Sequence, residues 1–214
     1  MAKEIRDLYQ LELFPEAIND RNNAHETSPE GASCVNCDIV SEFLVKTLIQ
    51  KIAIRERKQI SYLRLCSWRR SIKESQLAAL KILKHYRPPE FVDLAADQFV
   101  FGLKKIYGSQ VISNVVPVPC GNSGHHDCFS RQLAVRIAQK TAARVVFALE
   151  GDLGRGSSHP KKSNHWKAPR LTTKINGPAL LVDDIATSGV HMTKSLDVLR
   201  KNGVDAVGVA WIGP

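Results

Sequence analysis

The stretch Leu180-Leu-Val-Asp-Asp-Ile-Ala-Thr-Ser-Gly189 decides the fold of this chain. Its apolar start is typical of a buried strand, and the strand leads directly into two adjacent carboxylates. A Thr-Ser-Gly turn then opens residues 188–202, whose pattern predicts a helix that Gly203 ends. A helix start rich in small and hydroxyl residues offers backbone N–H groups and a positive dipole end, which suit a phosphate.

The paired acids Asp183 and Asp184 have their own chemistry. Two carboxylates at a strand tip can accept hydrogen bonds from vicinal hydroxyls, and they can help to hold Mg²⁺ beside substrate phosphates. The alternative interpretation is an ordinary helix whose start two aspartates cap.

The second half of the chain alternates between strand and helix patterns. Strands are predicted over 111–116, 144–149, 179–182 and 206–212, with helices over 127–141 and 188–202. This alternation predicts an α/β fold with a central, mostly parallel sheet flanked by helices on both faces. Ligands in such folds bind at the carboxyl ends of the strands.

The first half of the chain is predicted to be mainly helical, after a polar and acidic stretch over residues 1–36. Helices are expected over 38–57, 71–87 and 90–107, and an alternating strand over 60–66. The form Ser-Ile-Lys-Glu at 71–74 is that of a capping box.

Composition restricts the classes of protein that remain. The 214 residues are 43% hydrophobic and 24% charged, as in an ordinary globular protein. No stretch approaches about 18 uninterrupted apolar residues, and the N-terminus lacks an apolar signal core, so we expect a cytoplasmic protein without a membrane span. The five cysteines are then expected to be reduced. Cys34 and Cys37 form a lone CxxC pair, whereas a structural zinc site needs a second pair.

The net charge of +9 is unevenly distributed. Residues 51–90 hold 11 basic and 3 acidic residues (+8), and residues 151–177 hold 6 and 1 (+5). The cluster over 51–90 is compatible with a solvated helical face and with a nucleic-acid surface.

Residues 179–189 resemble the phosphoribosyl-pyrophosphate (PRPP) motif of type I phosphoribosyltransferases. The resemblance implies a type I phosphoribosyltransferase-like fold, in which Asp183 and Asp184 bind the ribose hydroxyls and Mg²⁺ accompanies PRPP. It assigns the 5′-phosphate to the loop and helix start, Ala186, Thr187, Ser188, Gly189 and His191. The chain departs from the motif at Ala186, where a larger aliphatic residue is usual, and at His191, where a small or hydroxyl residue is usual.

A second resemblance lies upstream. Val116-Pro-Val-Pro119 and, after a gap, Phe129-Ser-Arg-Gln-Leu-Ala134 are similar to the competence-protein ComF branch of this superfamily. The resemblance implies a pyrophosphate-binding loop formed by Pro119, Cys120, Gly121, Asn122, Ser123 and Gly124. The usual arginines are replaced by His125-His126-Asp127, and the usual glycine by Cys128. The branch also tends to carry a four-cysteine zinc module, of which only one pair is present here.

The polar stretch over 150–177 resembles the mobile loop that closes over PRPP in this family. Lys161 and Lys162, together with Lys167 and Arg170, would neutralise pyrophosphate and assist catalysis. A basic loop with no catalytic part is the alternative. We divide the chain into an N-terminal extension over 1–70 and a phosphoribosyltransferase-like domain over 71–214. The extension is expected to contain a helix and elements of the hood, the variable region that determines substrate choice in this superfamily.

The implied activity is transfer of phosphoribose from PRPP to a nitrogenous acceptor with release of pyrophosphate. Enzymes of this superfamily that act on 6-oxopurines have an aspartate where Thr187 stands, which argues against such a base. The alternatives are a catalytically silent ComF-like protein that serves DNA uptake or nucleic-acid handling, and a PRPP-sensing regulator. A homodimer is compatible with each of them.

Overall fold

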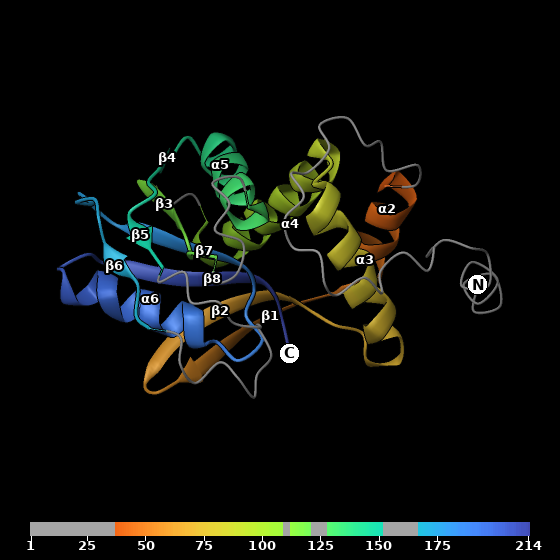
Figure 1. The fold of residues 1–214 in the computed structure, drawn as a ribbon, viewed down its shortest axis with the longest axis horizontal. Coiled ribbons are helices and arrows are strands. Elements are labelled where there is room, and N and C mark those ends of the chain that lie inside the picture. Colours follow the sequence, from red (N-terminus) through yellow and green to blue (C-terminus); the bar gives the residue numbers. More distant parts are fainter. Residues whose placement is uncertain (1–36, 109–111, 121–127, 152–166) are drawn as a thin grey trace, which may run out of the picture.

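One six-stranded sheet organises the protein, as Figure 1 shows. The structure is a computed structural model that describes residues 37–108, 112–120, 128–151 and 167–214. The strands lie in the order β1 (Ile49–Arg57), β2 (Ile60–Ser67), β8 (Ala206–Gly213), β7 (Ala179–Ile185), β3 (Asn114–Pro117) and β4 (Arg144–Val145). All neighbours are parallel except β1 and β2, so the predicted mixed α/β fold with a mostly parallel sheet is confirmed.

Helices cover both faces of this sheet (Figure 1). Four helices contribute to a first hydrophobic core on one face: α2 (Cys37–Thr47), α3 (Lys73–Tyr86), α4 (Pro89–Tyr107) and α5 (Phe129–Thr141). Its centre is aromatic, with Phe91 and Phe129 stacked at 5.2 Å between ring centroids and Trp211 beside them. The helix α6 (Val190–Lys201) covers the opposite face and forms a second core.

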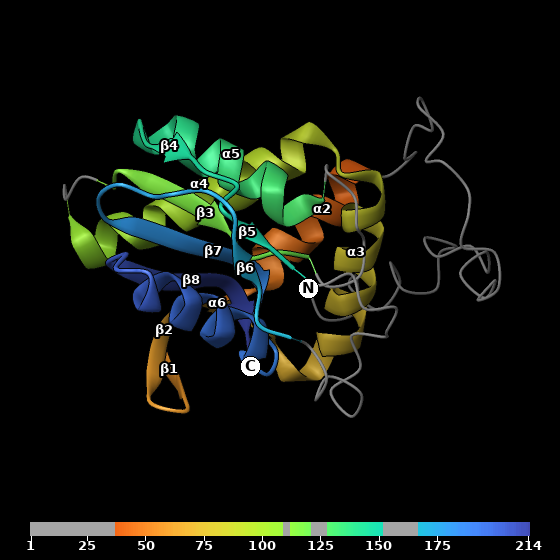
Figure 2. The ribbon, with the colours of Figure 1, turned by 60° about the vertical axis from the view of Figure 1, so that its left-hand side comes forward.

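The hairpin of β1 and β2 corrects the helix predicted over 38–57. That helix ends at Thr47, and the chain turns into an edge strand that pairs antiparallel with β2. The two turn residues, Lys58 and Gln59, have φ angles of +50° and +61°. Asn-Gly is the usual sequence that predicts a hairpin turn of this conformation. Figure 2 shows this hairpin extending away from the helices α4 and α5.

Other element boundaries also differ from the prediction. The residues of the expected capping box do not cap a helix, because Ser71 lies in a short 3₁₀ turn (Arg70–Ile72) that precedes α3. The strand predicted over 144–149 is divided between β4 and β5 (Leu149–Glu150), and β5 pairs with β6 (Arg170–Leu171) in a separate two-stranded sheet.

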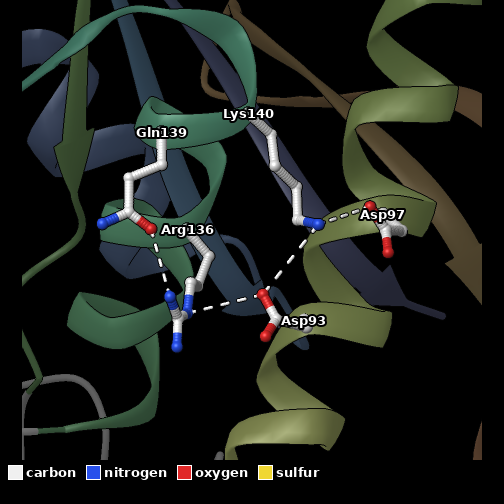
Figure 3. A network of polar contacts seen from close by, with 5 residues as sticks. All are labelled: Asp93, Asp97, Arg136, Gln139 and Lys140. Carbon is white, nitrogen blue, oxygen red and sulfur yellow. Dashed lines mark hydrogen bonds and ion pairs between the residues drawn. The ribbon is translucent and has the colours of Figure 1, made fainter.

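An ion-pair network links α4 to the second half of α5 (Figure 3). Lys140 Nζ lies 2.7 Å from Asp97 Oδ1, and Arg136 Nε lies 3.4 Å from Asp93 Oδ1. These side chains are partly exposed, so each pair contributes at most about 1 kcal/mol. Apolar packing in the first core is therefore the main force that fixes α5 on the sheet.

Two further findings concern the expectations from composition. Within the described ranges, no helix is both long enough and apolar enough to cross a membrane. Cys37 is disulfide-bonded, so the expectation of a reduced thiol is wrong at this position.

Candidate functional site

The carboxyl ends of β3 and β7 form the edge of the sheet that is the candidate crevice for a ligand. These strands are parallel neighbours, with Pro117 opposite Val182, and the Val118 N–H donates to the Val182 carbonyl at 2.8 Å. The helix that follows β3 packs in the first core, whereas the helix that follows β7 packs in the second core. Since the two helices leave toward opposite faces, the carboxyl ends of β3 and β7 form a topological switch point, where ligands bind in open α/β sheets.

Both predicted acids lie at the carboxyl end of β7, and both are buried. Leu181 packs in the second core, and Leu180 and Val182 pack in the first. Asp184 contacts Lys84 of α3, and the Asp183 and Asp184 carboxyl groups interact with each other. The two acids thus lie together at the end of the strand where the sequence predicted them.

Asp184 is held by Lys84, a residue of α3 that sequence reasoning missed. The Lys84 Nζ lies 2.5 Å from Asp184 Oδ2, and Asp184 Oδ1 accepts the Ile185 N–H at 2.7 Å. The Asp184 side chain is only 7% exposed, whereas that of Lys84 is 36% exposed. Lys84 is thus the more exposed member of the pair.

The surroundings of Asp183 disfavour the charged form of its carboxyl group. It is buried, and burial together with the negative charge of Asp184 raises its pKa well above the usual range, against the opposing effect of Lys84. Burial disfavours the charged form because the interior solvates an ion poorly. A bound cation, or hydroxyl groups that donate to this carboxylate, would relieve that cost.

The acid pair fits Mg²⁺ bound together with a phosphorylated ligand. Carboxylate oxygens are the hard ligands that Mg²⁺ prefers, and this ion takes one or two of them and completes its shell with water and phosphate. In the described part of the chain, no group of three or more His, Cys, Asp or Glu residues is arranged to hold a metal ion.

The loop after β7 combines a buried anchor with exposed hydroxyls. Ala186 is buried and its N–H donates to the Ile212 carbonyl at 3.0 Å, while Thr187 and Ser188 are exposed. Gly189 adopts φ +69° immediately before α6. A Cβ atom on Gly189 would lie 2.6 Å from the Tyr62 hydroxyl oxygen, so both the conformation and the packing require glycine.

The β1–β2 hairpin supports this loop from the side. The Arg57 guanidinium donates to the Ser188 carbonyl at 3.0 Å, and Tyr62 packs against Gly189. Burial raises the pKa of Tyr62, so its hydroxyl stays protonated. The hairpin therefore brings a positive charge and a phenol to the loop, and neither was assigned to the site from the sequence.

His191 lies in the first turn of α6, as expected, and is half-buried. Burial and the charge of Lys194 lower its pKa, so it is neutral at physiological pH. A neutral imidazole contributes a hydrogen-bonding group to the helix start but no positive charge.

The remaining predicted residues are only partly within the described ranges. Pro119 and Cys120 follow β3 at the crevice and are half-buried. Gly121, Asn122, Ser123, Gly124, Lys161 and Lys162 lie outside the described residues. Arg170 donates to Glu150 at 2.8 Å, so the small sheet of β5 and β6 engages this expected pyrophosphate ligand.

Comparisons with known proteins gave matches among solved structures alone. No protein-family model and no curated protein matches this chain. It is similar to an adenine phosphoribosyltransferase at 11% identity and a TM-score of 0.45, covering 82% of this chain and 89% of that one.

Two further solved structures are also similar. The adenine phosphoribosyltransferase of Saccharomyces cerevisiae, complexed with an imino-altritol bisphosphate and adenine, shows 13% identity and a TM-score of 0.44, covering 83% of this chain and 89% of that one. The orotate phosphoribosyltransferase of Aeropyrum pernix shows 18% identity and a TM-score of 0.38, covering 83% and 79%.

Proposed function

We propose that this protein binds PRPP in the crevice between β3 and β7 and transfers its phosphoribosyl group to a nitrogenous acceptor, releasing pyrophosphate. The observation that carries the proposal is the position of Asp183 and Asp184 at the carboxyl end of β7, directly before a hydroxyl-bearing loop and the start of α6. The switch point between β3 and β7 is where a ligand of this fold is expected.

The ribose would bind at the two acids. A carboxylate accepts hydrogen bonds from vicinal hydroxyls, and two such groups on adjacent residues can engage the 2′- and 3′-hydroxyls together. Burial and the charge of Asp184 raise the pKa of Asp183, so its surroundings disfavour the charged carboxylate. Donors from the ribose, or Mg²⁺ that accompanies PRPP, supply the missing compensation, so binding energy is available at the reacting sugar.

The 5′-phosphate would bind at the loop from Ala186 to Gly189. Thr187 and Ser188 expose their hydroxyls there, and the positive end of the α6 dipole favours an anion. Arg57, whose guanidinium already contacts the loop, adds a positive charge at its edge.

The pyrophosphate would leave on the Lys84 side of the crevice. As the C1–O bond breaks, its electron pair passes to the pyrophosphate oxygen while the acceptor nitrogen bonds to C1. Mg²⁺, when bound with the substrate, would neutralise part of this charge. Lys84, whose side chain is 36% exposed beside Asp184, would supply positive charge for the leaving oxygens. Stabilising the leaving group is the main task of the protein in such a displacement.

Pyrophosphate release measured across a panel of nucleobases tests this proposal. We expect release that requires PRPP, Mg²⁺ and one class of base, and that is lost in Asp183→Asn/Asp184→Asn. The matched control is Asp197→Asn, because Asp197 is a partly exposed acid on α6 that pairs with Lys201. Release that no base stimulates, in a protein that still binds PRPP, would favour the PRPP-sensing regulator.

The alternative of a silent ComF-like protein that handles nucleic acid rests on a separate surface. Lys51 and Lys58 of the β1–β2 hairpin and Lys73 and Lys81 of α3 are exposed. A gel shift on single-stranded DNA distinguishes this function, because phosphate contacts predict a steep loss of binding with salt.

A further inference from the structure

Three arginines of the β1–β2 hairpin reach the ends of β7 and β8 with their guanidinium groups. Arg64 Nη1 donates to the Gly213 carbonyl at 3.4 Å. Arg55 Nη2 donates to the backbone oxygen of the next residue, Pro214. Because these two acceptors belong to consecutive residues, the two guanidinium groups lie near each other at the end of β8. The third arginine, Arg57, reaches the loop after β7.

The two neighbouring arginines retain donors that no acceptor satisfies. The Nε atoms of Arg55 and Arg64 are buried and have no hydrogen-bond partner among the described residues. Arg64 is only 5% exposed. Its stem packs against Gly213, since a Cβ atom on that glycine would lie 2.9 Å from Arg64 Cδ. Buried donors are nearly always paired in proteins, so unpaired N–H groups on charged side chains indicate a missing acceptor.

The positive charges of these side chains are also uncompensated. In the part of the chain that the structure describes, no aspartate or glutamate forms an ion pair with Arg55, Arg57 or Arg64, which we call the arginine cluster. Burial and the charge of Arg55 lower the pKa of Arg64, because both disfavour its charged form. Lys84 differs, since its ammonium group is paired with Asp184. A bound anion would relieve both the repulsion and the unpaired donors of the cluster.

The arginine cluster is accessible through its two outer members. Arg55 and Arg57 are partly exposed, and Arg57 Nη1 donates to the carbonyl of the exposed Ser188 at 3.0 Å. Tyr62 stands opposite Arg55 in the hairpin register, so its protonated hydroxyl is a further donor on the same face. An anion can therefore approach from solvent past Arg55 and Arg57, with Arg64 as the buried donor.

We propose that the arginine cluster is a binding site for a phosphate group. A guanidinium group is planar and always charged, and its fork of N–H donors matches the oxygens of phosphate. A phosphate dianion presents enough acceptor oxygens for the unpaired Nε atoms of both Arg55 and Arg64. A single carboxylate would leave more of the positive charge of the three arginines uncompensated.

This inference rests on the contacts of the hairpin and not on the proposed PRPP chemistry. Arg57 borders the loop to which we assign the 5′-phosphate, whereas Arg55 and Arg64 bind the end of β8. The test therefore uses Arg55 and Arg64, which the proposed transfer reaction does not require.

Calorimetric titration of the full chain with inorganic phosphate, in buffer without Mg²⁺, tests the site. We expect phosphate binding that Arg55→Gln weakens at least about tenfold, because a charge-assisted hydrogen bond is lost. Arg55 is partly exposed, so this variant should keep its fold. Arg64→Gln should weaken binding as well. Circular dichroism checks the folding of both variants, and Arg55→Gln alone decides if Arg64→Gln does not fold.

Two controls separate this site from general electrostatics and from the proposed function. Lys81→Gln removes one positive charge from α3, which packs in the first core on the opposite face of the sheet from α6, and it should bind phosphate as the wild type does. Asp183→Asn/Asp184→Asn should bind phosphate at least as tightly as the wild type, even though it is expected to lose pyrophosphate release.

Ribose 5-phosphate, titrated in parallel, identifies the source of the phosphate group. Equal affinity for the two probes indicates free phosphate. Tighter binding of the sugar phosphate, with the gain lost in Asp183→Asn/Asp184→Asn, indicates the phosphate of a sugar ligand; in both cases Arg55→Gln must weaken binding. The proposal is overturned if the wild type binds neither probe, or if Arg55→Gln binds both as tightly as the wild type.

Discussion

Replacing Lys84 by methionine should lower the free energy of unfolding, because the buried acids Asp183 and Asp184 then lose a compensating cation. Lys84 Nζ lies 2.5 Å from Asp184 Oδ2, and the variant leaves two buried carboxyl groups without this cation. Removing one partner of a fully buried pair costs about 3–5 kcal/mol. Because the Lys84 side chain is 36% exposed, solvent screening reduces the expected loss to about 1–2 kcal/mol.

The assay is thermal unfolding followed by circular dichroism, with Lys81→Met as the control. Lys81 is an exposed lysine on the same helix, one turn earlier. For a chain of this size the loss corresponds to a fall in melting temperature of about 2–8 °C. The difference between the variants should shrink in acid, where protonation removes the charges that Lys84 compensates. Equal melting of both variants at neutral pH would refute the reasoning.

Two further predictions concern stability. Asp183 binds its proton more tightly in the folded state than in the unfolded chain, because its pKa is raised on folding. Its contribution to the free energy of unfolding is therefore fully present below its ordinary pKa of 3.8. That contribution is lost as the pH rises through the raised pKa. Asp183→Asn should therefore raise the melting temperature at neutral pH and change it little below pH 3.8; a lower neutral melting temperature would contradict this sign. Gly189→Ala should cost about 2–4 kcal/mol in urea unfolding, from its left-handed backbone and the contact with Tyr62. Gly203→Ala, at φ +75° in open space, has the backbone cost alone, so equal losses would show that Tyr62 does not restrict this loop.

The candidate acids and loop were predictable because they are local in sequence. A buried strand, two acids, a hydroxyl turn and a helix follow one another within 179–202, and each has its own pattern. Propensity and periodicity act over such distances, so the strand tip and helix start could be placed without knowledge of the rest of the fold.

Lys84 and Tyr62 could not be found in this way. Each reaches the acids or the loop through tertiary packing of an element more than 90 residues upstream. The helix of Lys84 and the strand of Tyr62 were both predicted, but periodicity does not say which strand end a helix or strand will face. The residue types themselves, a lysine on an amphipathic helix and a tyrosine on an amphipathic strand, do not indicate that either one belongs to a functional site.

The β1 strand was misassigned for a different reason. Its apolar residues Ile52 and Ile54 continue the spacing of the preceding helix, and the usual hairpin signal is replaced by Lys58-Gln59. Pairing with β2 is a non-local contact, and it overrides the local pattern.

Calorimetric titration of PRPP with Mg²⁺ tests the central claim most directly. The wild type and Asp197→Asn should bind with the same affinity, because Asp197 lies away from the crevice and pairs with Lys201. Asp183→Asn/Asp184→Asn should lose at least about tenfold in affinity, the consequence of about 1.4 kcal/mol of lost hydrogen bonding and charge compensation. Equal binding by the double variant and the wild type would contradict the assignment of the ribose site to these acids.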